Sequence, residues 1–289
     1  MKHFKVRKLV LLALVLIGVG TVGTWLTRES ATDSHDPVEV TVPVAGMDSL
    51  RINASNRRID FAVSNNDEVR VVMEGNTGRT DLTAEVVGNG IVIEAKEEQH
   101  RQFMNFNFGF SFQFNRPRSS TLTVYLPEHE FEQITATTTN AHISAGNLPS
   151  TDVVLTTSNG RVDASNMPGD LMVRTTNGQV DLRDIAGNVR VNSTNGSVNL
   201  NRIDGNVSVE TTNGRLEFTN PTLAQDVSLR TTNGRITVRL DEEPEDVRFT
   251  TDTTNGDVTL FGGNSWNHGN AYYEVNLRTT NGRITVETR

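Results

Sequence analysis

The chain has 289 residues, and its 35% apolar residues and 23 glycines place it near the composition of soluble domains and away from that of disordered chains. It contains no cysteine, which excludes a disulfide framework, a thiolate metal site, a cysteine nucleophile and a lipid anchor on a cysteine. Thr, with 36 residues, favours strands, and Asn, with 29, favours turns. The composition therefore predicts an all-β protein and says little about chemistry.

The N-terminus has the pattern of a targeting segment. It begins with four basic residues: Lys2, Lys5, Arg7 and Lys8. An uninterrupted stretch of apolar and small residues follows over positions 9–26. Because a cleaved signal peptide has an apolar region of only ~7–15 residues, we expect a retained signal-anchor transmembrane helix within residues 1–30. Small residues at Gly20 and Gly23 leave cleavage as the alternative.

The charges predict both topology and partners. Basic residues before the apolar stretch place the N-terminus in the cytoplasm and everything after Arg28 outside it, in the periplasm or at the cell surface of a bacterium. Beyond residue 30 the chain has 22 basic and 34 acidic residues, a formal charge of −12. We therefore expect the membrane as a partner of the N-terminus and no nucleic-acid partner, because phosphate binding needs a basic face.

An internal repeat organises the second half of the chain. The dipeptide Asn-Gly recurs at spacings of 18, 18, 18, 20, 22 and 26 residues, and Thr-Thr precedes five of its seven copies. The predicted structural turns are Asn159, Gly160, Asn177, Gly178, Asn195, Gly196, Asn213, Gly214, Asn233, Gly234, Asn255, Gly256, Asn281 and Gly282. A degenerate copy surrounds Asn140. In the type repeat, residues 189–206, apolar residues alternate on both sides of the turn, which is strand periodicity twice per repeat.

Two architectures fit this pattern. In a β-solenoid, each repeat is one coil of about 18 residues, and five aliphatic residues per coil fill a narrow core. In a meander, each Asn-Gly is a type I′ hairpin turn with positive φ at both residues. Near-identity in register favours the solenoid, since like stacks on like. Positive φ at Gly196 and Gly214 is the associated expectation, under which Gly→Val should be destabilising.

The extra residues of the longer repeats all fall after the strand that follows Asn-Gly, which predicts one corner of the stack that is free to vary. We divide the rest of the chain by its periodicity. Residues 31–48 form a tether and a first strand over 38–44, residues 49–135 form a diverged β-repeat region with a Phe-rich insertion, and residues 136–289 form the regular repeat region. No segment after residue 30 has a helical period.

A membrane-anchored N-terminus followed by recurring TTNG-x-V-x-L units and I-x-G-N corners resembles the bacterial putative-adhesin family of β-strand-repeat domains, a domain of unknown function. The resemblance spans roughly residues 40–289. It implies a β-solenoid-like fold and a location in the cell envelope. It carries no catalytic residues to transfer.

Motifs for catalysis and metal binding are weak. The six histidines are scattered without metal-ligand spacing, and no nucleophile elbow, P-loop or dinucleotide fingerprint occurs. We expect no cofactor and no metal. Stacking should align one polar row, Asp163, Asp181, Asn199, Glu217, Thr237, Thr259 and Thr285. It should also form rows of arginine facing acidic neighbours: Arg161, Arg215, Arg235 and Arg283 after Asn-Gly, and Arg174, Arg230 and Arg278 before Thr-Thr. Solvated strand faces are the simplest interpretation of these rows.

One segment is a candidate for docking a partner or a membrane. It holds six phenylalanines, of which the last five alternate strictly with other residues and would share one strand face: Phe103, Phe106, Phe108, Phe110, Phe112 and Phe114. Such an apolar face either covers the open N-terminal end of the stack or docks on a membrane or partner.

These observations predict a non-enzymatic β-solenoid on the outer side of the bacterial cytoplasmic membrane. It would act as an adhesin-like binding or scaffold module of the cell envelope, with a protein, glycan or lipid partner. Two alternatives stand beside this hypothesis: a glycan-active enzyme, which needs two or three carboxylates converging in a groove, and a component that senses envelope stress.

Overall fold

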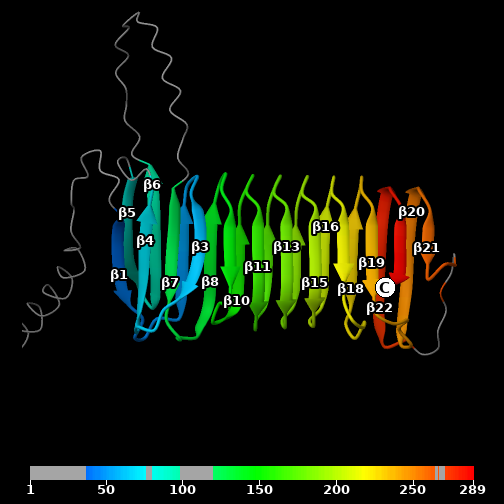
Figure 1. The fold of residues 1–289 in the computed structure, drawn as a ribbon, viewed down its shortest axis with the longest axis horizontal. Coiled ribbons are helices and arrows are strands. Elements are labelled where there is room, and N and C mark those ends of the chain that lie inside the picture. The colour runs from blue at the N-terminus through cyan, green and yellow to red at the C-terminus, as the bar shows by residue number, and fades with distance from the viewer. Residues whose placement is uncertain (1–36, 76–79, 98–119, 264–265, 267–270) are drawn as a thin grey trace, which may run out of the picture.

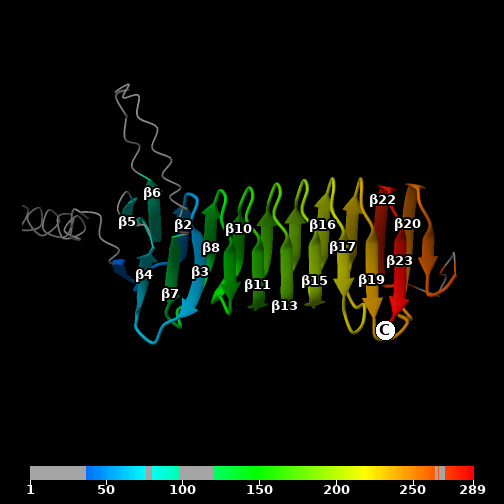
Figure 2. The same ribbon diagram turned by 45° about the horizontal axis from the view of Figure 1, so that its top comes forward.

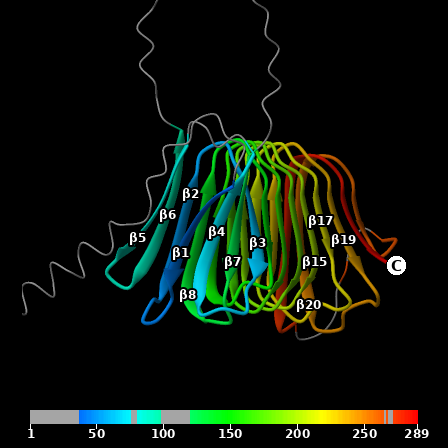
Figure 3. The same ribbon diagram turned by 60° about the vertical axis from the view of Figure 1, so that its left-hand side comes forward.

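The computed structural model describes residues 37–75, 80–97, 120–263, 266 and 271–289, and within them every regular element is a β-strand. Two sheets lie face to face and form an elongated stack (Figures 1 and 3). The twelve strands of sheet A run in the spatial order β1 (Val38–Pro43), β4 (Glu68–Glu74), β7 (Thr121–Leu126), β3 (Arg58–Val63), β9 (Ile143–Gly146), β11 (Val162–Met167), β13 (Val180–Ile185), β15 (Val198–Ile203), β17 (Leu216–Thr219), β19 (Ile236–Leu240), β23 (Ile284–Thr288) and β21 (Val258–Leu260).

Sheet B has eleven strands. Their spatial order is β20 (Val247–Asn255), β22 (Tyr273–Asn281), β18 (Val227–Thr231), β16 (Val207–Thr211), β14 (Val189–Asn192), β12 (Asp170–Arg174), β10 (Ser150–Thr156), β8 (Phe131–Thr138), β2 (Ser49–Ala54), β6 (Gly90–Glu97) and β5 (Thr80–Val87). Strands pair in parallel from β8 and β9 to the C-terminal end. The all-β solenoid prediction is therefore confirmed, and the hairpin meander is wrong, because hairpins would make these pairs antiparallel.

Each regular coil contains one strand from each sheet (Figure 2). The chain runs along sheet B, turns at the Asn-Gly corner, runs back along sheet A, and reaches the next coil through a second bend, the return corner. Between neighbouring regular coils the register shifts by one repeat, so that Val189 lies beside Val207 and Leu182 beside Leu200. Like side chains therefore stack on like.

The core is a single apolar cluster between the sheets. The strand alternation directs the predicted aliphatic side chains inward, and all five in the type coil are at most 2% exposed: Val189, Val191, Val198, Leu200 and Ile203. The last of these reaches the core by a backbone kink. Four equivalent residues at the return corner have positive φ, Asn147, Asn166, Asp184 and Arg202. The residue after each is buried: Leu148, Met167, Ile185 and Ile203.

The first Thr of the TTNG motif holds the Asn-Gly corner together. The Thr175 hydroxyl accepts a hydrogen bond of 2.9 Å from the Gly178 N–H in its own coil. In other coils the equivalent hydroxyl donates to the carbonyl of the preceding coil, as Thr231 does to Gly214 at 3.1 Å and Thr279 to Gly234 at 3.0 Å. These threonines are buried, so their hydroxyls satisfy backbone groups that water cannot reach.

The expectation of positive φ at Gly196 and Gly214 is wrong, because positive φ among the described glycines occurs only at Gly46, Gly75, Gly88 and Gly262. Glycine is needed at the Asn-Gly corner for a different reason. A Cβ on Gly196 would lie 1.9 Å from the Gly178 carbonyl oxygen, and a Cβ on Gly214 would lie 2.0 Å from that of Gly196. The corners stack backbone on backbone, and only hydrogen fits between them.

The last two coils are out of chain order. Strands β22 and β23 lie between the β18–β19 coil and the β20–β21 coil, so the outermost coil precedes the penultimate one in sequence. Residues 241–246 connect β19 to the outermost coil, and residues 261–272 stand between that coil and β22 in the sequence. These are the two longest insertions at the return corner. The insertions lie at the return corner, as predicted, and the two longest accompany the coils that are out of chain order.

The N-terminal end repeats this arrangement and then departs from the repeat. Strands β2 and β3 lie in parallel between the β6–β7 coil and the β8–β9 coil. Beyond β6 and β7, however, the pairing becomes antiparallel, with β5 on β6, β4 on β7 and β1 on β4. Strands β2, β3, β6 and β7 thus belong to the stack, and β1, β4 and β5 close its end.

Candidate functional site

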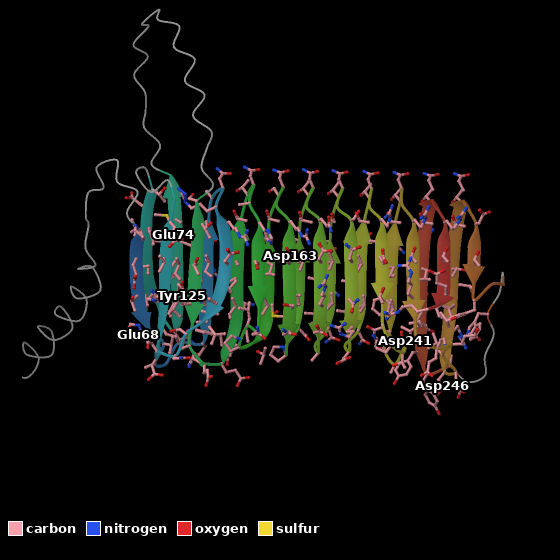
Figure 4. All side chains as sticks on the ribbon, in the orientation of Figure 1. Glu68, Glu74, Tyr125, Asp163, Asp241 and Asp246 are labelled. Carbon is pink, nitrogen blue, oxygen red and sulfur yellow. The ribbon has the colours of Figure 1, made fainter. Side chains whose placement is uncertain are left out.

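The outward-facing residues of a parallel stack form rows, because each coil repeats the position of the one before it about 4.8 Å away. The most regular row runs along the Asn-Gly corners and is visible as an evenly spaced line of side chains along the upper edge in Figure 4. It contains nine asparagines in the spatial order Asn56, Asn140, Asn159, Asn177, Asn195, Asn213, Asn233, Asn281 and Asn255. We call this row the Asn ladder.

From Asn140 onward, each side-chain amide of the Asn ladder donates to the side-chain oxygen of the asparagine in the neighbouring coil. From Asn159 to Asn255 the N···O distances are 2.5–2.8 Å. The row includes Asn56 and Asn140, which shows that the diverged copies occupy true coil positions. The seven predicted Asn-Gly turns therefore lie at one edge of the stack. Their side-chain amides hydrogen-bond to one another, which makes this edge a structural element.

The predicted polar row on sheet A is confirmed by the strand register. Asp163 lies beside Asp181, Asp181 beside Asn199 and Asn199 beside Glu217, and the row continues through Thr237, Thr285 and Thr259. Arg161 bridges the first two carboxylates, with Nε 2.7 Å from Asp163 and Nη2 3.0 Å from Asp181. The hydrogen bond to Asp163 raises the pKa of the Arg161 guanidinium. Figure 4 shows Asp163 on the face of the stack.

Further ion pairs connect neighbouring coils of sheet A. Arg202 donates to Asp184 with Nη2 2.7 Å from Oδ2, which lowers the pKa of that carboxyl and raises the pKa of the guanidinium. Arg239 pairs with Glu217 and lies 2.9 Å from Glu287. All these groups are solvent-accessible, so the pairs hold coils in register more than they stabilise the fold.

The predicted arginine rows form only in part. After Asn-Gly, Arg215, Arg235 and Arg283 lie on consecutive coils, but Gln179 and Ser197 separate them from Arg161. Before Thr-Thr, Arg230 lies beside Arg278, while Asn192 and Glu210 separate them from Arg174. Arg278 pairs with Asp252 at 3.1 Å. Neither row is a continuous anion-binding strip.

A groove of about 510 Å³ lies on the outer face of sheet B, beside the return corner, and was not predicted. All its acidic side chains and two of its amides form one row: Asp152, Asp170, Asn188, Asn206, Asp226 and Glu274. A second row of mixed chemistry lines its other side: Met172, Arg190, Ser208, Ser228 and Asn276. The groove runs across six strands. The sequence signal for it is the Asn or Asp that follows Gly in the I-x-G-N corner.

The groove's polar row also builds the corner. Asp170 accepts hydrogen bonds from the Asn188 backbone N–H at 2.8 Å and from its side-chain amide. The Asn188 side chain then accepts from the Asn206 N–H at 3.0 Å, and the Asn206 side chain from the Asp226 N–H at 3.1 Å. The carboxylates therefore project side by side along one wall and do not converge from opposite walls.

This geometry suits binding more than catalysis. Asp152 and Asp170 are neighbours across one strand pair, but two amide rungs separate Asp170 from Asp226. The described residues hold no group of three or more His, Asp or Glu side chains that could bind a metal ion. A long groove with alternating carboxylates, amides, hydroxyls and one guanidinium offers many hydrogen bonds to an extended polar chain.

Two predicted features lie outside the described residues. They are the membrane anchor within residues 1–30 and the candidate docking segment Phe103, Phe106, Phe108, Phe110, Phe112 and Phe114. In the sequence the latter falls between β6 and β7. Across the portion of the chain that the structure covers, no helix has the length and apolarity needed to cross a bilayer.

A family model described as Toastrack DUF4097 matches residues 47–287, nearly the whole stack. The chain belongs to the Toastrack DUF4097 family. This agrees with the resemblance drawn from the TTNG repeats. No curated protein matches the sequence.

Several solved structures resemble this chain at low sequence identity. A structure named a putative adhesin from Bacteroides fragilis has a TM-score of 0.50 and 13% identity, covering 88% of this chain and 98% of its own. One named a putative lipid binding protein from Parabacteroides distasonis has a TM-score of 0.43 and 13% identity, with 88% and 98% coverage. A putative cell adhesion protein from Clostridium sporogenes has a TM-score of 0.32 and 16% identity, with 88% and 100% coverage. None of these names describes an enzyme.

Proposed function

We propose that this Toastrack protein is a non-enzymatic binding or scaffold module of the bacterial cell envelope, held to the cytoplasmic membrane by its N-terminal segment. The observation that carries the binding role is the groove on sheet B. It crosses six strands, is lined by charged, amide and hydroxyl side chains, and matches an extended polar ligand better than a compact one. The names of the similar structures agree with such a role.

The location rests on the sequence. Four basic residues, followed by an apolar stretch over positions 9–26, precede the acidic remainder of the chain. By the positive-inside rule this pattern leaves the stack outside the cytoplasm. The connection to the stack is short, since β1 begins at Val38. The N-terminal end of the stack would then lie near the membrane, with the C-terminal end directed away from it.

Reporter fusions test the location. A phosphatase fused after Arg289 should be active, and a fluorescent reporter that matures only in the cytoplasm should stay dark. The full-length fusion should pellet with membranes and resist alkaline extraction. Replacing Lys2, Lys5, Arg7 and Lys8 by Glu should weaken or reverse this orientation. A cytoplasmic reporter signal from the unaltered chain, or a shortened soluble form beginning near Thr21 or Thr24, would contradict the anchored topology.

Blocking the groove tests the binding role. Ser208 is exposed on the groove's second row, and Thr194 is exposed on the Asn-Gly edge of a neighbouring coil. The full chain carrying Ser208→Trp should lose partners that cross-link to it in intact envelopes, whereas Thr194→Trp should retain them. Equal capture by both variants would place binding elsewhere. Sorting the captured material into protein, glycan and lipid identifies the partner class.

The glycan-active enzyme is the competing function, and the neighbouring carboxylates of Asp152 and Asp170 are what favours it. Cell-wall glycan incubated with the full chain should release no reducing ends. Release that disappears in the Asp152→Asn and Asp170→Asn variants would overturn the non-enzymatic proposal.

A further inference from the structure

The C-terminal end of the stack finishes in an edge strand with a distinctive pattern. Among the described residues, β20 pairs only with β22 and has no strand on its other side. Its exposed outer positions are Arg248, Thr250 and Asp252. Opposite charges therefore stand four residues apart, with a threonine midway. An edge strand of nine residues offers unpaired N–H and C=O groups to any strand that can align with it.

This pattern is complementary to itself. When two copies of β20 run antiparallel about a two-fold axis through Thr250, Arg248 of each copy lies directly opposite Asp252 of the other. Opposite charges at facing positions stabilise a strand pair, and like charges destabilise it. Because Arg248 is the only basic and Asp252 the only acidic residue of β20, only this register places the two opposite each other on both sides of the axis. Within one copy Asp252 also lies 3.1 Å from Arg278 of β22, and Arg248 lies beside Glu274, so charges alternate in sign across the paired strands.

The edge strand at the other end has the same spacing and the opposite character. On β5 the exposed outer positions are Asp81, Thr83 and Glu85, and within the part of the chain that the structure describes β5 pairs only with β6. An antiparallel pair of two β5 strands about Thr83 would place Asp81 opposite Glu85, which is a like-charge contact twice over. The charges on the two edge strands of sheet B therefore favour antiparallel self-pairing of β20 and disfavour that of β5.

Pairing β20 with β5 of a second copy is less favourable than pairing β20 with itself. With the two threonines aligned, Arg248 faces a carboxylate, but Asp252 faces another carboxylate in either strand direction. One attraction is then offset by one repulsion, whereas the β20 pair has two attractions. Two-fold pairing uses up both β20 edges and closes the assembly, while β20–β5 pairing would extend into a filament.

Apolar surface lies directly behind the proposed pair. Phe249, on the inner side of β20 beside Thr250, is only partly buried and packs edge to face against Phe261, with ring centroids 6.0 Å apart. The Trp266 ring packs at a tilt against Phe261, with ring centroids 4.4 Å apart. These rings cover the core at the last coil. Because they adjoin the two-fold axis, a second copy would bury them further.

We propose that two copies of this chain associate through their C-terminal ends, with β20 pairing antiparallel to β20 of the second copy about Thr250. Each sheet B then continues into the other, and the two N-terminal ends lie at opposite ends of a doubled rod. The pairing depends on neither the groove nor the membrane anchor, so it stands or falls separately from the proposed function. With the anchor proposed above, such a dimer would link two facing membranes.

Cysteine cross-linking of the full-length chain in detergent tests the pairing, because the chain has no cysteine of its own. Thr250→Cys should form a disulfide-linked dimer under mild oxidation, since a residue on the two-fold axis faces its own copy. Thr83→Cys on β5 is the matched control and should cross-link at least tenfold more slowly. Light scattering should give twice the chain mass for the unaltered protein.

Charge reversal tests the register. In the Thr250→Cys background, Arg248→Asp should slow cross-linking at least tenfold, and adding Asp252→Arg should restore it. Circular dichroism should show the strand content of each variant unchanged. Equal cross-linking from Thr83→Cys, no restoration by the double reversal, or a monomer at every concentration would overturn the proposal.

Discussion

At both ends of the stack, two neighbouring coils are arranged in the reverse of their order in the sequence. At the N-terminal end, β2–β3 lies inside β6–β7, and at the C-terminal end β22–β23 lies inside β20–β21. Beyond this point the ends differ. The N-terminal end adds antiparallel strands β1, β4 and β5, and contacts between β1 and β5 bring the two sheets together over the core.

The C-terminal end adds no antiparallel strand among the described residues. Its last coil still runs parallel to its neighbour, and partly buried aromatic rings of Phe249, Phe261 and Trp266 cover the core. The end of a solenoid must therefore be secured to the stack, and its open edge must be closed. Interposing a coil secures the chain near its ends, because each interposed strand has partners on both sides. Closing the edge requires strands that abandon the repeat.

Truncation of the C-terminal end should cause the largest loss of stability. Removing residues 273–289 deletes only the interposed coil, yet it leaves β20 and β21 without their strand partners. We expect this chain to be no more stable than one lacking residues 241–289, with residues 241–272 cleaved rapidly by protease. Thermal unfolding and limited proteolysis of both truncations provide the measurement. A shorter truncation that clearly outperforms the longer one would mean that the outer coil can move into the slot.

Substituting the same residue at two glycines separates close stacking from backbone conformation. Gly196 has no room for a Cβ, whereas Gly88 has positive φ and open space around it. Asn tolerates positive φ, so Gly88→Asn should cost less than about 1 kcal/mol of unfolding free energy. Gly196→Asn should cost about 3 kcal/mol or more, because the coils must separate. Urea titration measures both, and equal costs would argue against backbone stacking as the constraint.

Removing a threonine hydroxyl from the Asn-Gly corner should cost more stability in the interposed coil than in the outermost one. Thr279 donates to the Gly234 carbonyl from a fully buried position, and Thr253 donates to Gly282 from a half-buried one. Thr279→Val should cost about 1–3 kcal/mol, since a buried carbonyl loses its donor. Thr253→Val should cost less than about 1 kcal/mol, because water can replace the hydroxyl. Thr→Ser at each position keeps the hydroxyl and controls for shape. Equal costs in urea titration would show that the outer coil is as well sealed as the inner one.

The exposed ion pair between Arg202 and Asp184 gives the smallest effect. Its hydrogen bond lowers the pKa of Asp184 in the folded protein, so the pair contributes stability above the ordinary pKa of the carboxyl, near 3.8. That contribution is lost as the pH falls through the lowered value. Arg202→Gln should therefore lower the urea midpoint slightly at pH 7 and leave it unchanged at a pH low enough to protonate Asp184 in the folded protein. A difference that persists at the lower pH would point to the positive φ of this residue as its cause.

The regular middle of the stack could be predicted because its sequence signals are redundant. Each coil repeats the alternation around Asn-Gly, and register follows from stacking like on like, so the row from Asp163 to Glu217 was predictable. The order of the last coils was not. Val258–Leu260 and Ile284–Thr288 carry the same alternation and fit either slot, and only the insertion lengths distinguish them.

The backbone of the corners was harder to predict than their position. Asn-Gly is a strong signal for positive φ, yet the structure uses its glycine for close approach. The residues that do adopt positive φ include Asp184 and Arg202, and nothing local in the sequence marks an arginine for that conformation. The sheet B groove could have been predicted by aligning the residues after Gly187 and Gly205 with Asp170. Its width depends on neighbouring side chains from separate coils, which no single repeat contains.

The interleaving at the C-terminal end has a consequence in time. A ribosome makes β20–β21 before β22–β23, so the outer coil emerges while the strands that will join it to the stack do not yet exist. The Asn ladder shows this delay. The side-chain oxygen of Asn233 accepts its hydrogen bond from Asn281, which is synthesised 48 residues later, and not from Asn255, which is synthesised first. Regular coils can add one after another during synthesis, whereas these two can only complete together. The rod therefore has a growing phase, which is sequential, and a finishing step, which is a single concerted event.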